Sequence, residues 1–152
     1  HAMSEHEKAA WWTLGSTALI WLFLATRFTD AGRIVELPAG LALETYIEMV
    51  VLWIVAAIVP AVIAAKDPSA QVKDERDRAI DALGDRWEGY VVVVAINVLV
   101  VHLLARGLYP DRTPSVTILD LGSTTALIFA LLTTLFLAEA VKQAVVLWQY
   151  RR

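Results

Sequence analysis

Four long apolar runs are the feature that most constrains what this chain can fold into. They cover roughly residues 10–26, 46–65, 89–105 and 116–138 of the 152. About 20 mostly apolar residues in a helix cross the hydrocarbon core of a bilayer, and each run reaches or approaches that length. The chain is 58% hydrophobic, above the roughly 45–50% that is usual for soluble domains. The runs predict a polytopic membrane protein with four transmembrane segments.

The expected fold is all-α, because backbone groups inside a bilayer must pair within their own segment. A short connection at 107–115 makes neighbouring helices antiparallel. We therefore expect one domain, residues 3–152, built as an antiparallel four-helix bundle, with a loop at 30–42. His1 and Ala2 precede Met3, which we interpret as the native start after a two-residue expression remnant.

The distribution of basic residues predicts the orientation. With four spans, both termini and the second connection lie on one side of the membrane. That side carries nine of the thirteen basic residues: Lys8, Lys66, Lys73, Arg76, Arg78, Arg86, Lys142, Arg151 and Arg152. The other side carries Arg27, Arg33, Arg106 and Arg112. Since basic residues favour the cytoplasmic face, we expect a protein of the inner (plasma) membrane with both termini in the cytoplasm.

A charged stretch separates the second and third apolar runs, with ten charged side chains in residues 73–90. Asp67 followed by Pro68 is a typical helix start. An apolar face then recurs at spacings of three and four through Ile80, Leu83, Trp87 and Tyr90. The third helix is therefore expected to extend into the cytoplasm, with 67–88 as its helical extension.

Five carboxylates share another face of this extension: Asp74, Asp77, Asp81, Asp85 and Glu88. A solvated helix commonly carries mixed charge, and flanking arginines neutralise part of the stripe. The alternative is a docking surface for a basic partner or a divalent cation. Like charges four residues apart repel by a few tenths of a kcal/mol, which a partner would relieve. Both interpretations stay open from sequence.

A second polar set is expected in the outer third of the membrane. Following each helix through the bilayer places Glu48, His102 and Asp120 at similar depth, with Arg27 and Arg106 nearby. Two carboxylates and an imidazole suit a divalent cation or a proton relay. The alternative is that the carboxylates pair with the arginines and fasten the helices. Asn97, near the middle of the third span, is expected to form an interhelical hydrogen bond or to contact a ligand.

Small residues at every fourth position mark candidate helix contacts. The fourth run carries such a stripe at Gly122, Ala126, Ala130, Thr134 and Ala138, and the second at Ala57, Ala61 and Ala65. Either stripe fits packing within the chain or a homodimer. Glu139, at the expected inner end of the fourth span, is interpreted as a partner for Lys142 or a loop arginine.

The motif Asp74-Glu75-Arg76-Asp77, followed by Ile80 and an aromatic start to a membrane span at Tyr90, carries a family resemblance. The chain resembles a family of small, uncharacterised bacterial four-helix integral membrane proteins in which a DERD-type motif precedes the third helix. The resemblance implies proteins often encoded beside small helix-turn-helix regulators, and hence sensing or sequestration of a regulator at the membrane.

Several chemistries are absent from the sequence. The chain has no cysteine, which excludes disulfides and thiolate sites. It has no nucleophile–base pair or phosphate loop, and a net charge of −3 without a basic stripe argues against direct nucleic-acid binding. We expect a non-enzymatic interaction or regulatory protein with no cofactor, apart from a divalent cation if the carboxylates bind one. The alternative is a small homodimeric transporter or cation-binding protein that uses the outer polar set.

Overall fold

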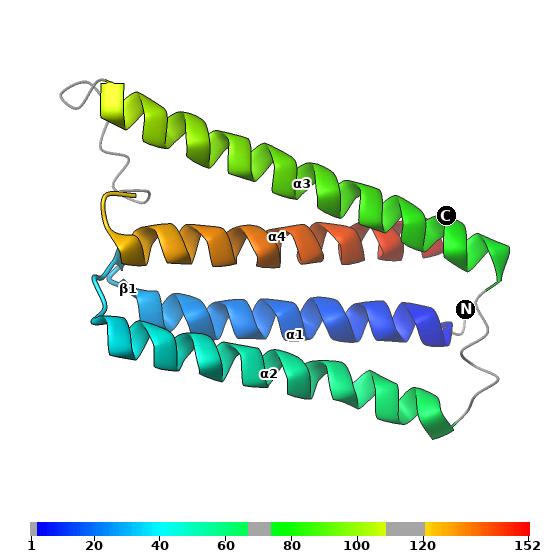
Figure 1. Ribbon diagram of the computed structural model, residues 1–152. Coiled ribbons are helices and arrows are strands. Elements are labelled where there is room, and N and C mark those ends of the chain that lie inside the picture. The colour runs from blue at the N-terminus through cyan, green and yellow to red at the C-terminus, as the bar shows by residue number, and fades with distance from the viewer. Residues whose placement is uncertain (1–2, 67–73, 109–120) are drawn as a thin grey trace.

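Four helices make up almost all of the described chain (Figure 1). The structure is a computed structural model that describes residues 3–66, 74–108 and 121–152. Its helices are α1 (Glu5–Phe28), α2 (Ala39–Lys66), α3 (Glu75–Leu108) and α4 (Thr124–Tyr150). Each is long and apolar enough to cross a membrane. The prediction of an all-helical chain with four candidate spans is confirmed, and these spans indicate a multi-pass membrane protein.

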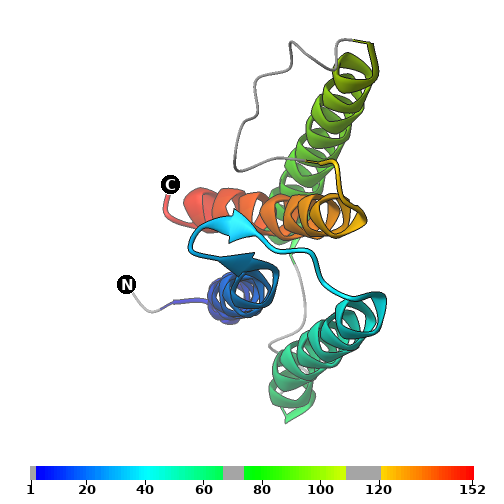
Figure 2. The ribbon, with the colours of Figure 1, turned by 90° about the vertical axis from the view of Figure 1, so that its left-hand side faces the viewer.

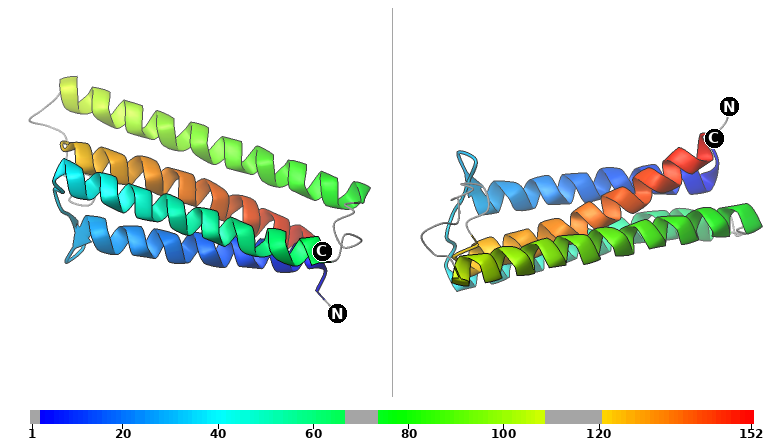
Figure 3. Two further views of the ribbon diagram at one scale, coloured as in Figure 1. Left: turned by 60° about the horizontal axis from the view of Figure 1, so that its bottom comes forward. Right: turned by 90° about the horizontal axis from the view of Figure 1, so that it is seen from above.

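The helices lie beside one another in the order α2, α1, α4, α3 (Figures 1 and 2). Helix α4 packs against α1 on one side and α3 on the other, and α1 packs against α2. The most apolar stretch of α4 is 39% buried, against 6% for that of α3. Helix α3 separates from α4 toward Leu108 (Figures 1 and 3). Most of its apolar surface is therefore left to meet lipid.

The main core lies where α1, α2 and α4 meet. Its buried members are Ile20, Leu24, Phe28, Met49, Leu132 and Phe136. Phe28 stacks on Phe129 with ring centroids 5.6 Å apart, and Trp53 of α2 meets Phe136 at 5.9 Å. Between helices in lipid, close packing rather than escape from water supplies most of the attraction. These interlocking rings therefore hold the three helices in register.

The two small-residue stripes have different surroundings. In α4, Ala126, Thr134 and Ala138 are buried, so this stripe serves packing within the chain. In α2, Ala57 and Ala61 are exposed. The side chain of Ala65 lies outside the described residues.

The start of α3 explains the acidic motif in structural terms. Asp74 Oδ1 accepts from the Asp77 N–H at 2.7 Å, while Asp77 Oδ2 accepts from the Asp74 N–H at 3.3 Å. This reciprocal pair is a capping box, which satisfies two backbone donors that the first helical turn leaves free. Asp74 is not helical, so the prediction that this helix starts at Asp67 and Pro68 is wrong; those two residues lie outside the described ones. The predicted continuity of α3 from this charged segment through Tyr90 into the apolar span is confirmed.

The fourth helix differs from its prediction at both ends. The span was expected at 116–138, but Leu121–Ser123 form a turn and the helix runs from Thr124 to Tyr150. The Ser123 hydroxyl accepts from the Ala126 N–H at 3.1 Å and fixes the start. Residues 116–120 lie outside the described ones. The midpoint of α4 therefore falls close to Glu139, well inside the helix.

The expected loop at 30–42 is in part a β-hairpin. Strand β1 (Thr29–Asp30) pairs antiparallel with β2 (Arg33–Ile34). The two turn residues both have positive φ, 47° at Ala31 and 77° at Gly32, as tight two-residue hairpins require. Helix α2 then begins at Ala39, before the predicted 46.

Candidate functional site

The charged part of α3 lies against α4 and the start of α1. The Tyr150 hydroxyl of α4 donates to Asp77 Oδ1 at 2.7 Å. His6 of α1 places its Nε2 3.6 Å from Asp77 Oδ2. Asp77 also caps its own helix, and its side chain is only 15% exposed. One carboxylate therefore joins three helices at this end of the bundle.

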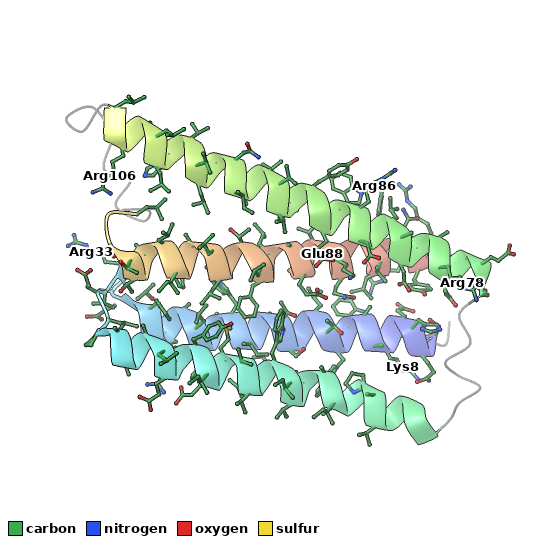
Figure 4. The ribbon with its side chains drawn as sticks, in the orientation of Figure 1. Lys8, Arg33, Arg78, Arg86, Glu88 and Arg106 are labelled. Atoms are coloured by element: carbon green, nitrogen blue, oxygen red, sulfur yellow. The ribbon has the colours of Figure 1, made fainter. Side chains whose placement is uncertain are left out.

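A second fastening lies two to three turns further along α3. Lys142 of α4 places Nζ 2.7 Å from Asp85 Oδ1 and 3.1 Å from Glu88 Oε2. Figure 4 shows Glu88 directed from α3 toward α4, with Arg86 on the opposite side of α3. Gly84, between these carboxylates, is buried, and a Cβ built on it would lie 3.0 Å from the Val146 side chain. The absence of a side chain there lets the two helices approach closely.

The acidic stripe is thereby divided. Asp77, Asp81 and Glu88 are half-buried toward α4, whereas Asp74 and Asp85 are exposed. Asp81 also has an interaction of its own.

The expected apolar face divides as well. Ile80 is buried with Ala10, Val146 and Leu147, while Trp87 and Tyr90 are exposed and contact each other edge to face at 6.0 Å. The face of α3 that meets α4 lies between the two predicted faces, because Ile80, Gly84 and Glu88 share it at helical spacing.

The outer polar set is spread over different helices. Arg27 of α1 and Glu48 of α2 form a 3.4 Å ion pair between side chains that are 47% and 40% exposed. His102 lies on α3, where it lines a shallow depression formed by residues of that helix alone. Asp120 lies outside the described residues. Within the described ranges, no group of three or more His, Cys, Asp or Glu side chains is arranged to hold a metal ion.

Asn97 differs from its expected role. It lines the same depression on α3 and is exposed. Its side-chain amide donates at 2.8 Å to the Val93 carbonyl of its own helix. The hydrogen bond that was expected to join two helices is therefore local.

Sequence reasoning missed a cavity at mid-height between α1, α2 and α4. Thr13, Ser16 and Thr17 of α1 line it with Trp53 of α2 and Glu139 of α4, among others. Glu139 does not pair with Lys142, which is bound to Asp85 and Glu88; instead Glu139 Oε1 accepts from Gln143 Nε2 at 2.7 Å. The missed signal was the length of α4: once the helix runs to Tyr150, Glu139 becomes a central residue.

Pro60 contributes to the same region. A proline inside a helix lacks the N–H that would bond to the carbonyl four residues earlier, here that of Ala56. Trp12 of α1 donates its indole N–H to this carbonyl at 2.9 Å. The proline thus supplies a polar link between α1 and α2 at the edge of the cavity.

Fold and sites together define a helical, multi-pass membrane protein with a charged segment at one end and a polar cavity at mid-height. Comparisons with known protein families, curated proteins and solved structures found no match.

Proposed function

We propose that this chain is a non-enzymatic protein of the bacterial inner membrane that acts as an interaction or regulatory module. Its docking surface is the charged start of α3, in a bundle whose consecutive helices run antiparallel. The partner is a basic cytoplasmic protein, such as a small transcription regulator, and the protein contacts no nucleic acid itself. The acidic side chains that carry the docking are Asp74 and Asp85, which are exposed.

The length of α3 is the observation that carries this proposal. The helix has 34 residues, about 51 Å at 1.5 Å per residue, whereas the bilayer core needs only about 30 Å. The surplus corresponds to the charged turns from Glu75 to Glu88. A charged helical segment is stable outside the hydrocarbon, so this part of α3 extends from the membrane as a rigid rod.

The side on which it extends follows from the basic residues. In Figure 4, Lys8, Arg78 and Arg86 lie toward one end of the bundle, while Arg33 and Arg106 lie at the other. The richer end is cytoplasmic by the positive-inside rule. Both termini and the charged start of α3 then face the cytoplasm, where a soluble partner has access.

Anchoring gives the docking surface its rigidity. Asp77 and Glu88 are held by Tyr150 and Lys142, so they fix the helix rather than bind a partner. Asp85 is bonded to Lys142, yet its side chain remains 62% exposed. A basic group of the partner approaches this carboxylate from solvent and competes with Lys142 for it.

Charge reversal at the exposed positions tests the proposal. We expect the chain, purified in mild detergent, to retain a basic soluble protein that is lost from an Asp74→Lys, Asp85→Lys variant. The contact should also dissociate in roughly 1 M salt, where charges are screened beyond about 3 Å. The matched control is Glu36→Lys, an exposed carboxylate at the opposite end, which should leave the partner bound. Retention by the double variant contradicts the docking surface.

A homodimeric transporter or cation-binding protein that uses the outer polar set is the second candidate. The exposed Ala57 and Ala61 on α2 favour its dimer, since small residues allow helices to approach. Glu48 is already held by Arg27, and His102 lies on a different helix. The acidic docking surface therefore has the stronger support.

A further inference from the structure

The mid-height cavity has a volume of about 470 Å³ and lies between α1, α2 and α4. This volume falls in the range of small-molecule pockets, about 300–1,000 Å³. Ser16 lies close to the midpoint of α1, and Glu139 close to the midpoint of α4. The cavity is therefore at the depth where the surrounding bilayer is most apolar, and an ionisable residue there is costly unless it has a use or a partner.

Hydrogen-bond acceptors dominate the polar side of the cavity. The Thr13 hydroxyl donates to the Ala9 carbonyl at 3.0 Å and the Ser16 hydroxyl to the Thr13 carbonyl at 3.1 Å. Their protons are thus used within α1, and their lone pairs remain. Glu139 adds a carboxylate, of which Oε1 accepts from Gln143. A site of this kind attracts a positively charged donor.

Thr17 gives an independent sign of a missing ligand. Its residue is only 2% exposed, and its hydroxyl has no hydrogen-bond partner among the residues that the structure describes. Thr17 lines the same cavity as Glu139. Buried hydroxyls in native proteins nearly always find a partner, so a ligand that occupies the cavity would satisfy this group.

The remaining walls are apolar and aromatic. They include Val50, Ile54, Ala57 and Pro60, with the indole of Trp53. A bare metal ion needs several close oxygen ligands, whereas this cavity offers one carboxylate among mostly apolar walls. An aromatic face and apolar walls suit an organic cation, which gains from cation–π contact.

We propose that this cavity binds a small organic cation, an amine or quaternary ammonium with an apolar substituent, with the Glu139 carboxylate as its counter-charge. The Trp53 indole and the apolar residues of α2 surround the substituent. The inference is independent of the docking surface on α3, because no residue is shared between the two sites.

Equilibrium dialysis of labelled benzyltrimethylammonium against the protein in nanodiscs tests the proposal. We expect saturable binding to one site per chain. Glu139→Gln, which keeps the shape but removes the charge, should weaken binding by about tenfold or more, that is, at least about 1.4 kcal/mol. The matched control Glu48→Gln removes a carboxylate outside the cavity and should bind as the wild type does. Circular dichroism and gel filtration establish that each variant is folded.

Two further measurements use the wild-type chain and do not depend on how the variants fold. Neopentylbenzene, the neutral analogue of the same shape, should compete weakly. A photoreactive aryl-azide derivative of the cation should label peptides that contain Thr13, Ser16 or Trp53. No saturable binding, equal competition by the neutral analogue, undiminished binding to folded Glu139→Gln, or labelling only outside the cavity would each overturn the proposal.

Discussion

A single glycine determines how closely α3 approaches α4. A Cβ on Gly84 would lie 3.0 Å from Val146 Cγ2 and 3.2 Å from Lys142 Cγ. These are flexible side-chain atoms, so a methyl group alone would displace them slightly. A larger side chain cannot fit without separating the helices, which would disturb the neighbouring pairs of Lys142 with Asp85 and Glu88.

We therefore predict that Gly84→Leu destabilises the protein by about 1–3 kcal/mol, the usual cost of overpacking a close contact. Gly89 supplies the matched control, because it lies in the same helix and nothing lies within 4 Å of a Cβ built on it. Gly89→Leu should be neutral or mildly stabilising through helix propensity. Thermal unfolding in detergent measures both. Equal effects of the two substitutions would contradict the packing described for Gly84.

The residues of the charged site were identified from sequence, but their partners were not. Spacing along one chain predicts that Asp77, Asp81 and Glu88 share a face, because a helix repeats every 3.6 residues. It does not reveal that Lys142 and Tyr150, more than fifty positions later, meet that face. Glu139 was misplaced for a related reason: its role depends on where α4 begins and ends, and the hydroxyl of Ser123 decides that start.

At the scale of elements, local capping and turn chemistry account for what the apolar runs could not predict. The motif Asp74-Glu75-Arg76-Asp77 is, at its two ends, the capping box of α3. The hairpin between α1 and α2 follows from a turn in which Ala31 and Gly32 both have positive φ. A non-glycine residue with positive φ is costly, so Ala31 is a strained position that sequence periodicity does not report.

This strain predicts a stabilising substitution. Asparagine tolerates positive φ better than alanine, and Asn-Gly is the preferred pair for two-residue hairpins. Ala31→Asn should therefore stabilise the protein by about 0.5–1 kcal/mol, whereas Gly32→Ala should destabilise it by a similar amount. Thermal unfolding of both variants measures the effect. If Ala31→Asn lowers the melting temperature, the turn conformation described here is wrong.

At the scale of the whole molecule, the four helices and their apolar lengths were predictable, because a bilayer requires long helices whatever their local propensity. The order in which they pack was not. Apolar residues that face lipid and apolar residues that face another helix look alike in sequence, since lipid tails are as apolar as leucine. Val94 and Val98 of α3 are exposed, whereas Leu132 and Phe136 of α4 are buried, and the sequence does not distinguish them.

The central claim is that the chain crosses the membrane four times, with the charged start of α3 and both termini in the cytoplasm. Because the chain has no cysteine, single cysteines can report on it without interference. Glu36, between β2 and α2, and Arg152, beyond α4, are both exposed. Labelling Glu36→Cys and Arg152→Cys with a membrane-impermeant maleimide in intact cells tests the claim directly. We predict that Glu36→Cys is labelled in intact cells and that Arg152→Cys is labelled only after the membrane is opened. Labelling of both positions in intact cells, or of neither, would contradict it.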